Sequence, residues 1–363
     1  MRSLTLLLAL LPAWQTHAID ASVRLVQGQA GAPVAVAVAY AGVPAYRNRW
    51  ASQTYPLGSL TKSFTAAAVL QLADRGRFRL SDPIGAYLPN VASSRAPSIA
   101  TVLAQTAPWE DYSETPGFDP QRAYAPTQLL ALVPPPGSGD PPAFVYSNSN
   151  YVALGLLVEA TGGMPYARFV RERIAAPLAL PSLRYAGPSS LFSAGALWAT
   201  PVDVTTWLEA LLSNRLHVRP DLASLMFQTG YDGAHRPTGY GMGAFVGRTR
   251  GRLAYFAAGF TPRGSTYMMA LPDSHVEIAL ATTAAAFDLA PLALDLVDTL
   301  EPPVTTLLRT GEVESSTLQA RTLDSDGSLD LRYTVKVGGL TKNVFARYDR
   351  NGKQAVLSIT DER

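Results

Sequence analysis

The sequence predicts an α+β protein in which strands from both ends of the main domain enclose a helical segment. Segments with strand-like patterns of apolar residues lie at 32–40, 44–50, 239–247, 253–257, 265–271 and 276–282. Between these two groups, from about residue 80 to about residue 235, helical patterns alternate with Pro and Gly. This order indicates one sheet that is interrupted by a helical insertion.

Length and composition limit the class of protein. The chain has 363 residues, enough for one large catalytic domain and a small appendage. Apolar residues make up 47% and charged residues 16%, so most of the chain can bury a core and is not disordered. The net charge of +2 gives no attraction to nucleic acid or to an anionic membrane. The absence of cysteine excludes disulfides, thiolate catalysis and cysteine-ligated metal centres.

The first residues have the pattern of a secretory signal peptide, which we predict at residues 1–18. Arg2 gives a positive start, residues 4–11 form an apolar run, and Ala18 offers a small residue at the cleavage point. No other stretch reaches the ~18 apolar residues that a membrane-spanning helix needs. We therefore expect a periplasmic or secreted protein without a membrane span after cleavage.

Helix patterns fill the middle of the main domain, residues 19–301. The first helix is predicted from Leu60 to about Arg75, because Phe64, Ala68 and Leu72 share one face. Further helices are predicted at 151–160, 166–175 and 202–213, and an amphipathic stretch at 287–300 closes the domain.

A change in composition separates residues 302–363 from the main domain. Charged residues occur there at about twice their density in the first 301 residues, and the change begins at Glu301-Pro302-Pro303. Alternating residues at 329–337 and a second candidate strand at 355–359 surround the turn signals Asp326-Gly327 and Asn351-Gly352. We predict a small antiparallel β module.

Ser59 and Lys62 form the first candidate catalytic pair. If Ser59 lies where a loop meets the first helix, Lys62 lies one turn later and projects from the same side. The helix N-terminus favours a developing oxyanion, and a neutral, desolvated lysine can activate the weak serine nucleophile. The alternative is an N-capping serine followed by a solvated lysine.

The use of lysine in this chain favours the catalytic interpretation. Among 26 arginines there are four lysines, and three of these lie in the C-terminal module. Lys62 is therefore the only lysine in the first 335 residues. Arginine does not lose its proton in proteins, so it cannot replace lysine as a base.

Tyr146-Ser147-Asn148 is the second candidate. In an extended segment Tyr146 and Asn148 lie on one face, where a phenol can relay a proton and a carboxamide can orient the serine–lysine pair. Alone, this tripeptide is uninformative, because a Tyr/Asn pair before a helix usually forms a turn and a helix cap.

Other constellations are poor. The histidines His17, His217, His235 and His275 show no metal-ligand spacing, and Gly-x-Ser-x-Gly does not occur. Gly239-x-Gly241-x-Gly243 has the wrong spacing for a dinucleotide loop and is interpreted as a closely packed strand. We expect no metal and no organic cofactor.

The segment from Pro56 to Thr65, with Ser59 and Lys62, resembles the nucleophile segment of serine β-lactamase and penicillin-binding-protein-like hydrolases. The most similar branch contains class C β-lactamases, D,D-peptidases and related esterases, and the class A pattern does not match. Further motifs recur in the expected order over about residues 30–300: Leu80-Ser81-Asp82-Pro83, Tyr87-Leu88-Pro89, Tyr146-Ser147-Asn148, and Ser193 to Leu197 with Asp203.

The resemblance implies an antiparallel sheet flanked by helices and a set of site residues. It implies Ser59 as the acylated nucleophile, Lys62 and Tyr146 as the base pair, and Asn148 as an orienting residue. The family's third motif, Lys or His, a small residue and Gly, corresponds to Ala257-Ala258-Gly259.

Two departures from the family pattern follow. Alanine at 257 lacks the side chain that would engage a substrate carboxylate, whereas Gly259 and the Phe260 N–H can still complete an oxyanion hole. Arg263 is close enough in sequence to supply the missing cation. Gln105-Thr106-Ala107-Pro108 replaces the His-Thr-Ser-Gly of relatives and is expected to shape the helical insertion rather than the chemistry.

These observations predict an exported serine hydrolase that acts through a Ser59 acyl-enzyme on esters or amides of small molecules. The partner is then a small acyl substrate or a peptidoglycan-like peptide. The alternatives are a D,D-peptidase or β-lactamase, and a catalytically weakened relative that binds peptides.

Overall fold

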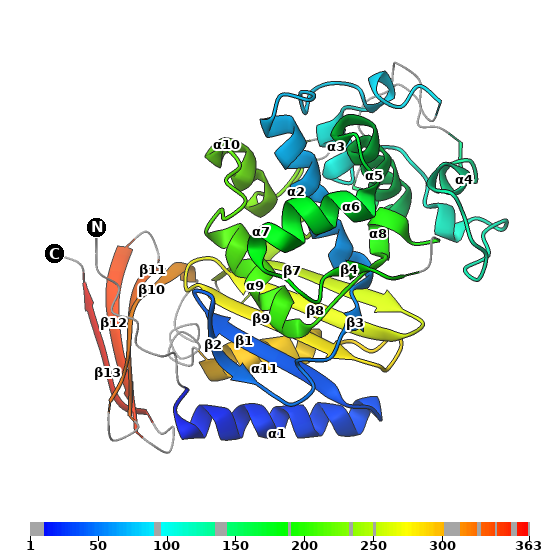
Figure 1. Ribbon diagram of the computed structural model, residues 1–363. Coiled ribbons are helices and arrows are strands. Elements are labelled where there is room, and N and C mark those ends of the chain that lie inside the picture. The colour runs from blue at the N-terminus through cyan, green and yellow to red at the C-terminus, as the bar shows by residue number, and fades with distance from the viewer. Residues whose placement is uncertain are drawn as a thin grey trace.

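The computed structural model describes residues 11–90, 96–134, 144–187, 190–231, 235–249, 252–300, 313–324, 328–337, 340–349 and 354–361. A six-stranded antiparallel sheet forms its centre, in the order β2-β1-β9-β8-β7-β6 (Figure 1). Its strands are β1 (Val34–Tyr40), β2 (Val43–Arg47), β6 (Phe245–Thr249), β7 (Arg252–Thr261), β8 (Gly264–Leu271) and β9 (Val276–Thr282). The predicted α+β class and the return of the chain to one sheet are confirmed.

Helices α1 (Ala13–Ala30) and α11 (Ala290–Leu300) cover one face of this sheet (Figure 1). Ile19 of α1 and Leu296 of α11 are fully buried in a core that includes Ile278 of β9. The two helices are also joined by a polar contact, because Gln15 Nε2 donates a hydrogen bond of 2.8 Å to the Thr299 carbonyl.

The opposite face of the sheet carries the helical part of the chain. Helix α9 (Pro201–Leu212) packs on β1, β8 and β9, and α2 (Thr61–Asp74) lies beside it (Figure 1). Phe64 of α2 stacks on Trp207 of α9, with ring centroids 4.1 Å apart. Residues of α2 are buried around the helix, as in a core helix, so the side chains near its start are held in fixed positions.

Further helices complete this layer. They are α3 (Ile99–Leu103), α4 (Pro126–Leu130), α5 (Asn148–Gly162), α6 (Tyr166–Val170), α7 (Ala176–Leu178), α8 (Phe192–Gly195) and α10 (Pro220–Ala223). The described residues also contain one π-helical turn, Arg171–Ala175, and four 3₁₀ turns, Gly58–Leu60, Ile84–Ala86, Tyr112–Glu114 and Ser224–Phe227. A small sheet of β3 (Tyr55–Pro56), β5 (Leu197–Ala199) and β4 (Arg184–Tyr185) lies at the start of α2.

One predicted strand was wrong in its extent. The segment 239–247 was expected to be extended throughout, but β6 begins only at Phe245. The preceding residues turn back on themselves, with the Gly241 N–H donating to the Ala244 carbonyl. Gly243 has φ +94°, and a methyl group there would lie 2.7 Å from the Ser63 Cα atom. Gly243 therefore serves close packing, as expected, but it does so against α2 and within a turn.

The C-terminal residues form a separate antiparallel sheet of β10 (Val313–Leu323), β11 (Leu329–Val337), β12 (Leu340–Tyr348) and β13 (Gln354–Asp361). Arg347 binds Asp324 and Asp330 at 2.7 and 2.6 Å. The predicted boundary at 301–303 and the two predicted turns lie outside the described residues.

The apolar run at 4–11 also lies almost entirely outside the described residues. Helix α1 runs without interruption across position 18, so cleavage there would remove its first residues, including Gln15. None of the helices that the structure describes is long and apolar enough to cross a membrane. The signal peptide stays a prediction.

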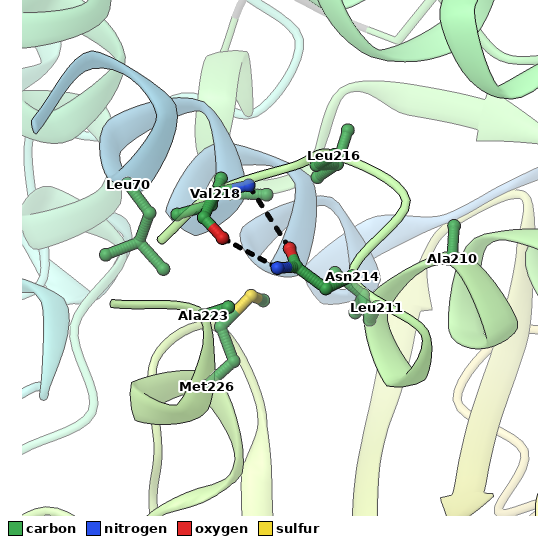
Figure 2. Close-up of a pocket in the computed structure, with 9 residues that line it drawn as sticks. Leu70, Ala210, Leu211, Asn214, Leu216, Val218, Ala223 and Met226 are labelled. Atoms are coloured by element: carbon green, nitrogen blue, oxygen red, sulfur yellow. Dashed lines mark hydrogen bonds between the residues drawn. The ribbon is translucent and has the colours of Figure 1, made fainter. Parts of the chain in front are cut away.

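A small pocket lies between α2, α9 and α10 (Figure 2). Its lining is apolar apart from Asn214, whose side-chain amide binds both the N–H and the carbonyl of Val218. The cavity measures about 20 Å³, room for little more than one water molecule. None of the predicted site residues lines it, so it is a packing defect beside α2 rather than a substrate site.

Candidate active site

Ser59 lies in a 3₁₀ turn that leads directly into α2. Two hydrogen bonds fix this turn against β5: the Leu57 N–H donates to the Leu197 carbonyl, and the Leu197 N–H donates to the side-chain Oγ1 of Thr61. Gly58 has φ +51°, a left-handed conformation that glycine adopts without strain. The sequence prediction that Ser59 precedes the first helix, with Lys62 one turn later, is confirmed.

Lys62 is fully buried, and its Nζ atom has three close oxygen neighbours. It lies 3.0 Å from Ser59 Oγ, 2.8 Å from Asn148 Oδ1 and 3.0 Å from the Ala194 carbonyl oxygen. Within the described part of the chain, no carboxylate lies within ion-pair distance of this amine. The solvated-lysine alternative is therefore wrong.

The three neighbours of Lys62 differ in what they can do. Asn148 Oδ1 and the Ala194 carbonyl oxygen only accept hydrogen bonds, so they engage two N–H groups of the amine. A neutral amine then has its lone pair left for the third neighbour, the hydroxyl of Ser59. This geometry suits removal of the serine proton by Lys62.

Asn148 is held by Asp111, a residue outside the motifs recognised in the sequence. Both the backbone N–H and the Nδ2 group of Asn148 donate to Asp111 Oδ2, each at 2.9 Å. The other carboxylate oxygen, Oδ1, accepts from the N–H and hydroxyl of Ser113. Because the Nδ2 group faces Asp111, the Oδ1 atom of Asn148 must face Lys62.

Tyr146 also reaches Lys62, but through its ring. The Nζ atom lies 4.8 Å from the centroid of the Tyr146 ring and 5.8 Å from that of Tyr151. Ring faces stabilise a cation, so they favour the ammonium that forms once Lys62 has taken a proton. Among the described residues the Tyr146 hydroxyl makes no hydrogen bond to Ser59 or Lys62, and its role in a proton relay stays a prediction.

The end of β7 completes the surroundings of Ser59. A methyl group added to Gly58 would lie 3.0 Å from the Phe260 amide nitrogen, and one added to Gly259 would collide with the Leu57 carbonyl. The backbone at Gly259 and Phe260 therefore lies against the Ser59 turn. Ala257 is buried on the same face of β7 as Gly259 and offers only a methyl group.

Arg263 is not part of this cluster. It lies exposed in the turn between β7 and β8, and its backbone N–H binds Thr261 Oγ1. Among the described residues the guanidinium contacts none of Ser59, Lys62 or Asn148. Arg263 as a substitute for the missing cation stays a prediction.

Gln105 holds the Tyr146-Ser147-Asn148 segment in place. It is fully buried in a left-handed conformation, with φ +60°, and its Oε1 atom accepts from the Ser147 N–H and from Asn150 Nδ2. Its carbonyl accepts from the Val145 N–H. As expected, this segment shapes the helical part; in addition, it holds the segment before α5 that carries Tyr146.

Comparison with known proteins agrees with this geometry. A family model described as Beta-lactamase matches residues 23–298. The chain is 24% identical over 220 residues to the protein PbpX of Bacillus subtilis, covering 53% of this chain and 54% of PbpX. It is 25% identical over 205 residues to the D-alanyl-D-alanine-carboxypeptidase/endopeptidase AmpH of Escherichia coli, covering 47% of this chain and 52% of AmpH. The chain thus spans about half the length of these curated relatives.

Solved structures show the same fold. A D-stereospecific amidohydrolase from Streptomyces sp. superposes with a TM-score of 0.66 at 24% identity, over 78% of this chain and 97% of the other. A D-amino acid amidase from Ochrobactrum anthropi superposes with a TM-score of 0.69 at 18% identity, over 79% and 98%.

Proposed function

The chain belongs to the β-lactamase family, and from this premise we propose that it is an exported serine hydrolase that works through an acyl-enzyme on Ser59. One observation carries the proposal: a buried lysine lies 3.0 Å from Ser59 Oγ while its other two oxygen neighbours are fixed carbonyl acceptors. A buried amine arranged in this way is suited to take a proton from serine.

In the acylation step, the Ser59 hydroxyl gives its proton to Lys62 while Oγ forms a bond to the substrate carbonyl carbon. The ammonium that results donates three hydrogen bonds, two of them to Asn148 Oδ1 and the Ala194 carbonyl, and faces the ring of Tyr146. Collapse of the tetrahedral intermediate expels the alcohol or amine, which takes a proton from the Lys62 ammonium directly or through the Tyr146 hydroxyl. Water then hydrolyses the Ser59 ester with the same base.

Backbone amides stabilise the oxyanion in this proposal. The candidates are the N–H groups of Ser59 and Phe260, because Gly58 and Gly259 bring β7 into contact with the Ser59 turn. Loss of a single oxyanion donor typically costs about 10²–10³ in kcat, so this contact is an essential part of the site.

The substrate class follows from the third motif. A penicillin or a peptide ending in D-alanine carries a carboxylate that loses water on entering the site, and a charge-assisted hydrogen bond would offset this by ~1.5–3 kcal/mol. Ala257 cannot provide such a bond. We therefore favour esters and amides without a free carboxylate, a class that includes the amides of D-amino acids named for the amidase from Ochrobactrum anthropi.

Fluorophosphonate labelling followed by intact mass tests the nucleophile. The wild-type protein should gain one adduct, whereas Ser59→Ala should gain none. Labelling of Ser59→Ala would place the nucleophile elsewhere, and an unlabelled wild type would favour the peptide-binding relative.

Substrate preference is tested by kcat/KM for a p-nitrophenyl ester and D-phenylalanine amide against nitrocefin. Ala257→Lys and Ala257→His should raise nitrocefin hydrolysis about 10- to 100-fold relative to the ester, since one charge-assisted bond is gained. A wild type that prefers nitrocefin would contradict this choice. If that preference is lost in Arg263→Ala, Arg263 is the missing cation and the D,D-peptidase or β-lactamase alternative holds.

Export is proposed from the sequence of residues 1–18 alone. Expression with the native start, followed by fractionation and N-terminal sequencing of the mature chain, tests it. A mature protein that begins at Ile19 is expected; an intact Met1 in the cytoplasm would contradict export.

A further inference from the structure

A second cluster of side chains with metal-ligating atoms lies at the other end of the sheet from Ser59. It consists of Glu209 near the end of α9, His275 in the turn between β8 and β9, and Glu277 of β9. One potential ligand atom from each residue lies within 4.8 Å of those from the other two.

Two carboxylate oxygens in this cluster are buried without a hydrogen-bond partner among the described residues. They are Oε1 of Glu277 and Oε2 of Glu209. Glu277 is fully buried, and its Oε2 atom accepts a long hydrogen bond of 3.3 Å from the Gly42 N–H. An unpaired buried carboxylate oxygen is costly, so the cluster is built to hold a positive species between its members.

Gly42 makes the cluster possible. A Cβ atom at this position would lie 2.9 Å from Glu209 Cγ, so only glycine allows the Glu209 side chain to lie over the β1–β2 turn. The Ala41 N–H of the same turn donates to the His275 carbonyl at 2.8 Å. The three donor residues and the turn therefore form one packed unit.

We propose that Glu209, His275 and Glu277 form a binding site for a divalent transition-metal ion, with Zn²⁺ as the best match. One imidazole and two carboxylates are ligands that Zn²⁺ accepts, while Mg²⁺ and Ca²⁺ prefer oxygen ligands alone. Around a tetrahedral Zn²⁺ with ~2.0–2.1 Å bonds, ligand atoms are about 3.3 Å apart. From separations of up to 4.8 Å, the ligand atoms need to approach one another by at most about 1.5 Å.

The competing occupant is a proton shared by the two carboxyl groups. Burial, and then repulsion by Glu209, raises the pKa of Glu277 to about 10, so Glu277 is a neutral acid in the metal-free protein at pH 7. The Glu209 carboxylate raises the pKa of His275, whose Nδ1 lies 3.7 Å from Glu209 Oε2. A metal ion would take the place of this proton and serve all three side chains at once.

The site would act on the fold rather than on the hydrolytic reaction. Glu277 lies at one end of β9, where it pairs with Ala39 of β1 and Ala270 of β8. Phe260, which lies beside Ser59, pairs with Ser265 of β8, and Ser265 pairs with Thr282 at the opposite end of β9. An ion bound by Glu209, His275 and Glu277 would tie α9 to the sheet and to the β1–β2 turn.

Zinc titration of the untagged full-length chain after treatment with a chelator tests the proposal. We expect one Zn²⁺ per chain by calorimetry and a Tm rise of about 5 °C at a zinc concentration 100 times Kd. Loss of a residue that only supports a metal ligand typically weakens metal affinity by roughly 10- to 100-fold. Each of the ligand variants Glu209→Gln, His275→Ala and Glu277→Gln should weaken zinc binding by more than this.

Matched controls separate this site from other sources of zinc binding. His217→Ala is the control for His275→Ala, because His217 is also exposed and its φ of +52° is close to the +50° of His275. The two substitutions therefore cause the same backbone strain, but His217→Ala should leave zinc binding unchanged. Ser59→Ala should bind zinc like the wild type, which separates this test from that of the hydrolase. Absence of stoichiometric binding, or equal binding by the three ligand variants, would overturn the proposal and leave the shared proton.

Discussion

Asp111 is expected to control catalysis without touching the nucleophile. Replacing it by asparagine changes only a carboxylate oxygen into an amide group. In the wild type, Oδ2 accepts two hydrogen bonds from Asn148 and Oδ1 accepts two from Ser113. Asparagine has one accepting oxygen, so its NH₂ group must face donors on one of these two sides.

The consequence is transmitted through the Asn148 amide. If the new NH₂ group faces Asn148, the Asn148 side chain rotates and presents its own NH₂ group to Lys62. The amine then loses an acceptor and turns its lone pair away from Ser59. Loss of one hydrogen bond to a charged group costs ~1.5–3 kcal/mol, which corresponds to a fall of about 10- to 150-fold in kcat.

Steady-state hydrolysis of a p-nitrophenyl ester measures the effect of Asp111→Asn. We expect a lower kcat and little change in KM. Glu110→Gln is the matched control, because it makes the same chemical change at the adjacent, exposed side chain. Its activity should equal that of the wild type. If Asp111→Asn kept more than half of the wild-type kcat, the expected rotation of the Asn148 amide would be refuted: either the new NH₂ group faces Ser113 or Asn148 is held without Asp111.

Three further variants test other parts of the structure. Lys62→Arg should lower kcat on the ester by roughly 10²–10⁴-fold, about as far as Lys62→Ala, because guanidinium keeps its proton; high residual activity would mean that only charge matters. Gly259→Ala should abolish fluorophosphonate labelling, since its methyl group collides with the Leu57 carbonyl, whereas Gly247→Ala meets only the Phe256 ring at 3.6 Å and should label normally. Asn214→Ala should lower the free energy of unfolding in urea by ~2–3 kcal/mol, because it loses two hydrogen bonds to Val218 in a left-handed conformation. Asn214→Gly should cost about 1 kcal/mol less, and equal losses would show that backbone strain plays no part.

The features that the sequence predicted well are those that depend on local spacing. Ser59 and Lys62 lie three residues apart, so a single helical turn is enough to bring them together. The burial of Phe64 and Leu72 follows from a helical period, and β9 has the predicted bounds because turns flank a continuous apolar run.

Contacts between distant segments were missed because no local pattern records them. Asp111 and Asn148 are 37 positions apart, and Gln105 and Ser147 are 42 apart. The Ala194 carbonyl belongs to the backbone and leaves no mark on residue type. Glu209 and Glu277 show no metal-ligand spacing in the sequence, and they come together because α9 packs on β9.

The surroundings of Lys62 explain why this buried position holds a lysine and not an arginine. Its three oxygen neighbours come from three separate segments: Ser59, Asn148 and Ala194. Three acceptors satisfy the three N–H groups of an ammonium, whereas a guanidinium carries five and would leave donors unpaired in a buried site. Two of those acceptors are carbonyl oxygens held by packing, so the amine is oriented by the fold and not by an opposite charge. Exchange of a proton with Ser59 then requires no movement of the lysine, and the position is specific for lysine on geometric as well as on chemical grounds.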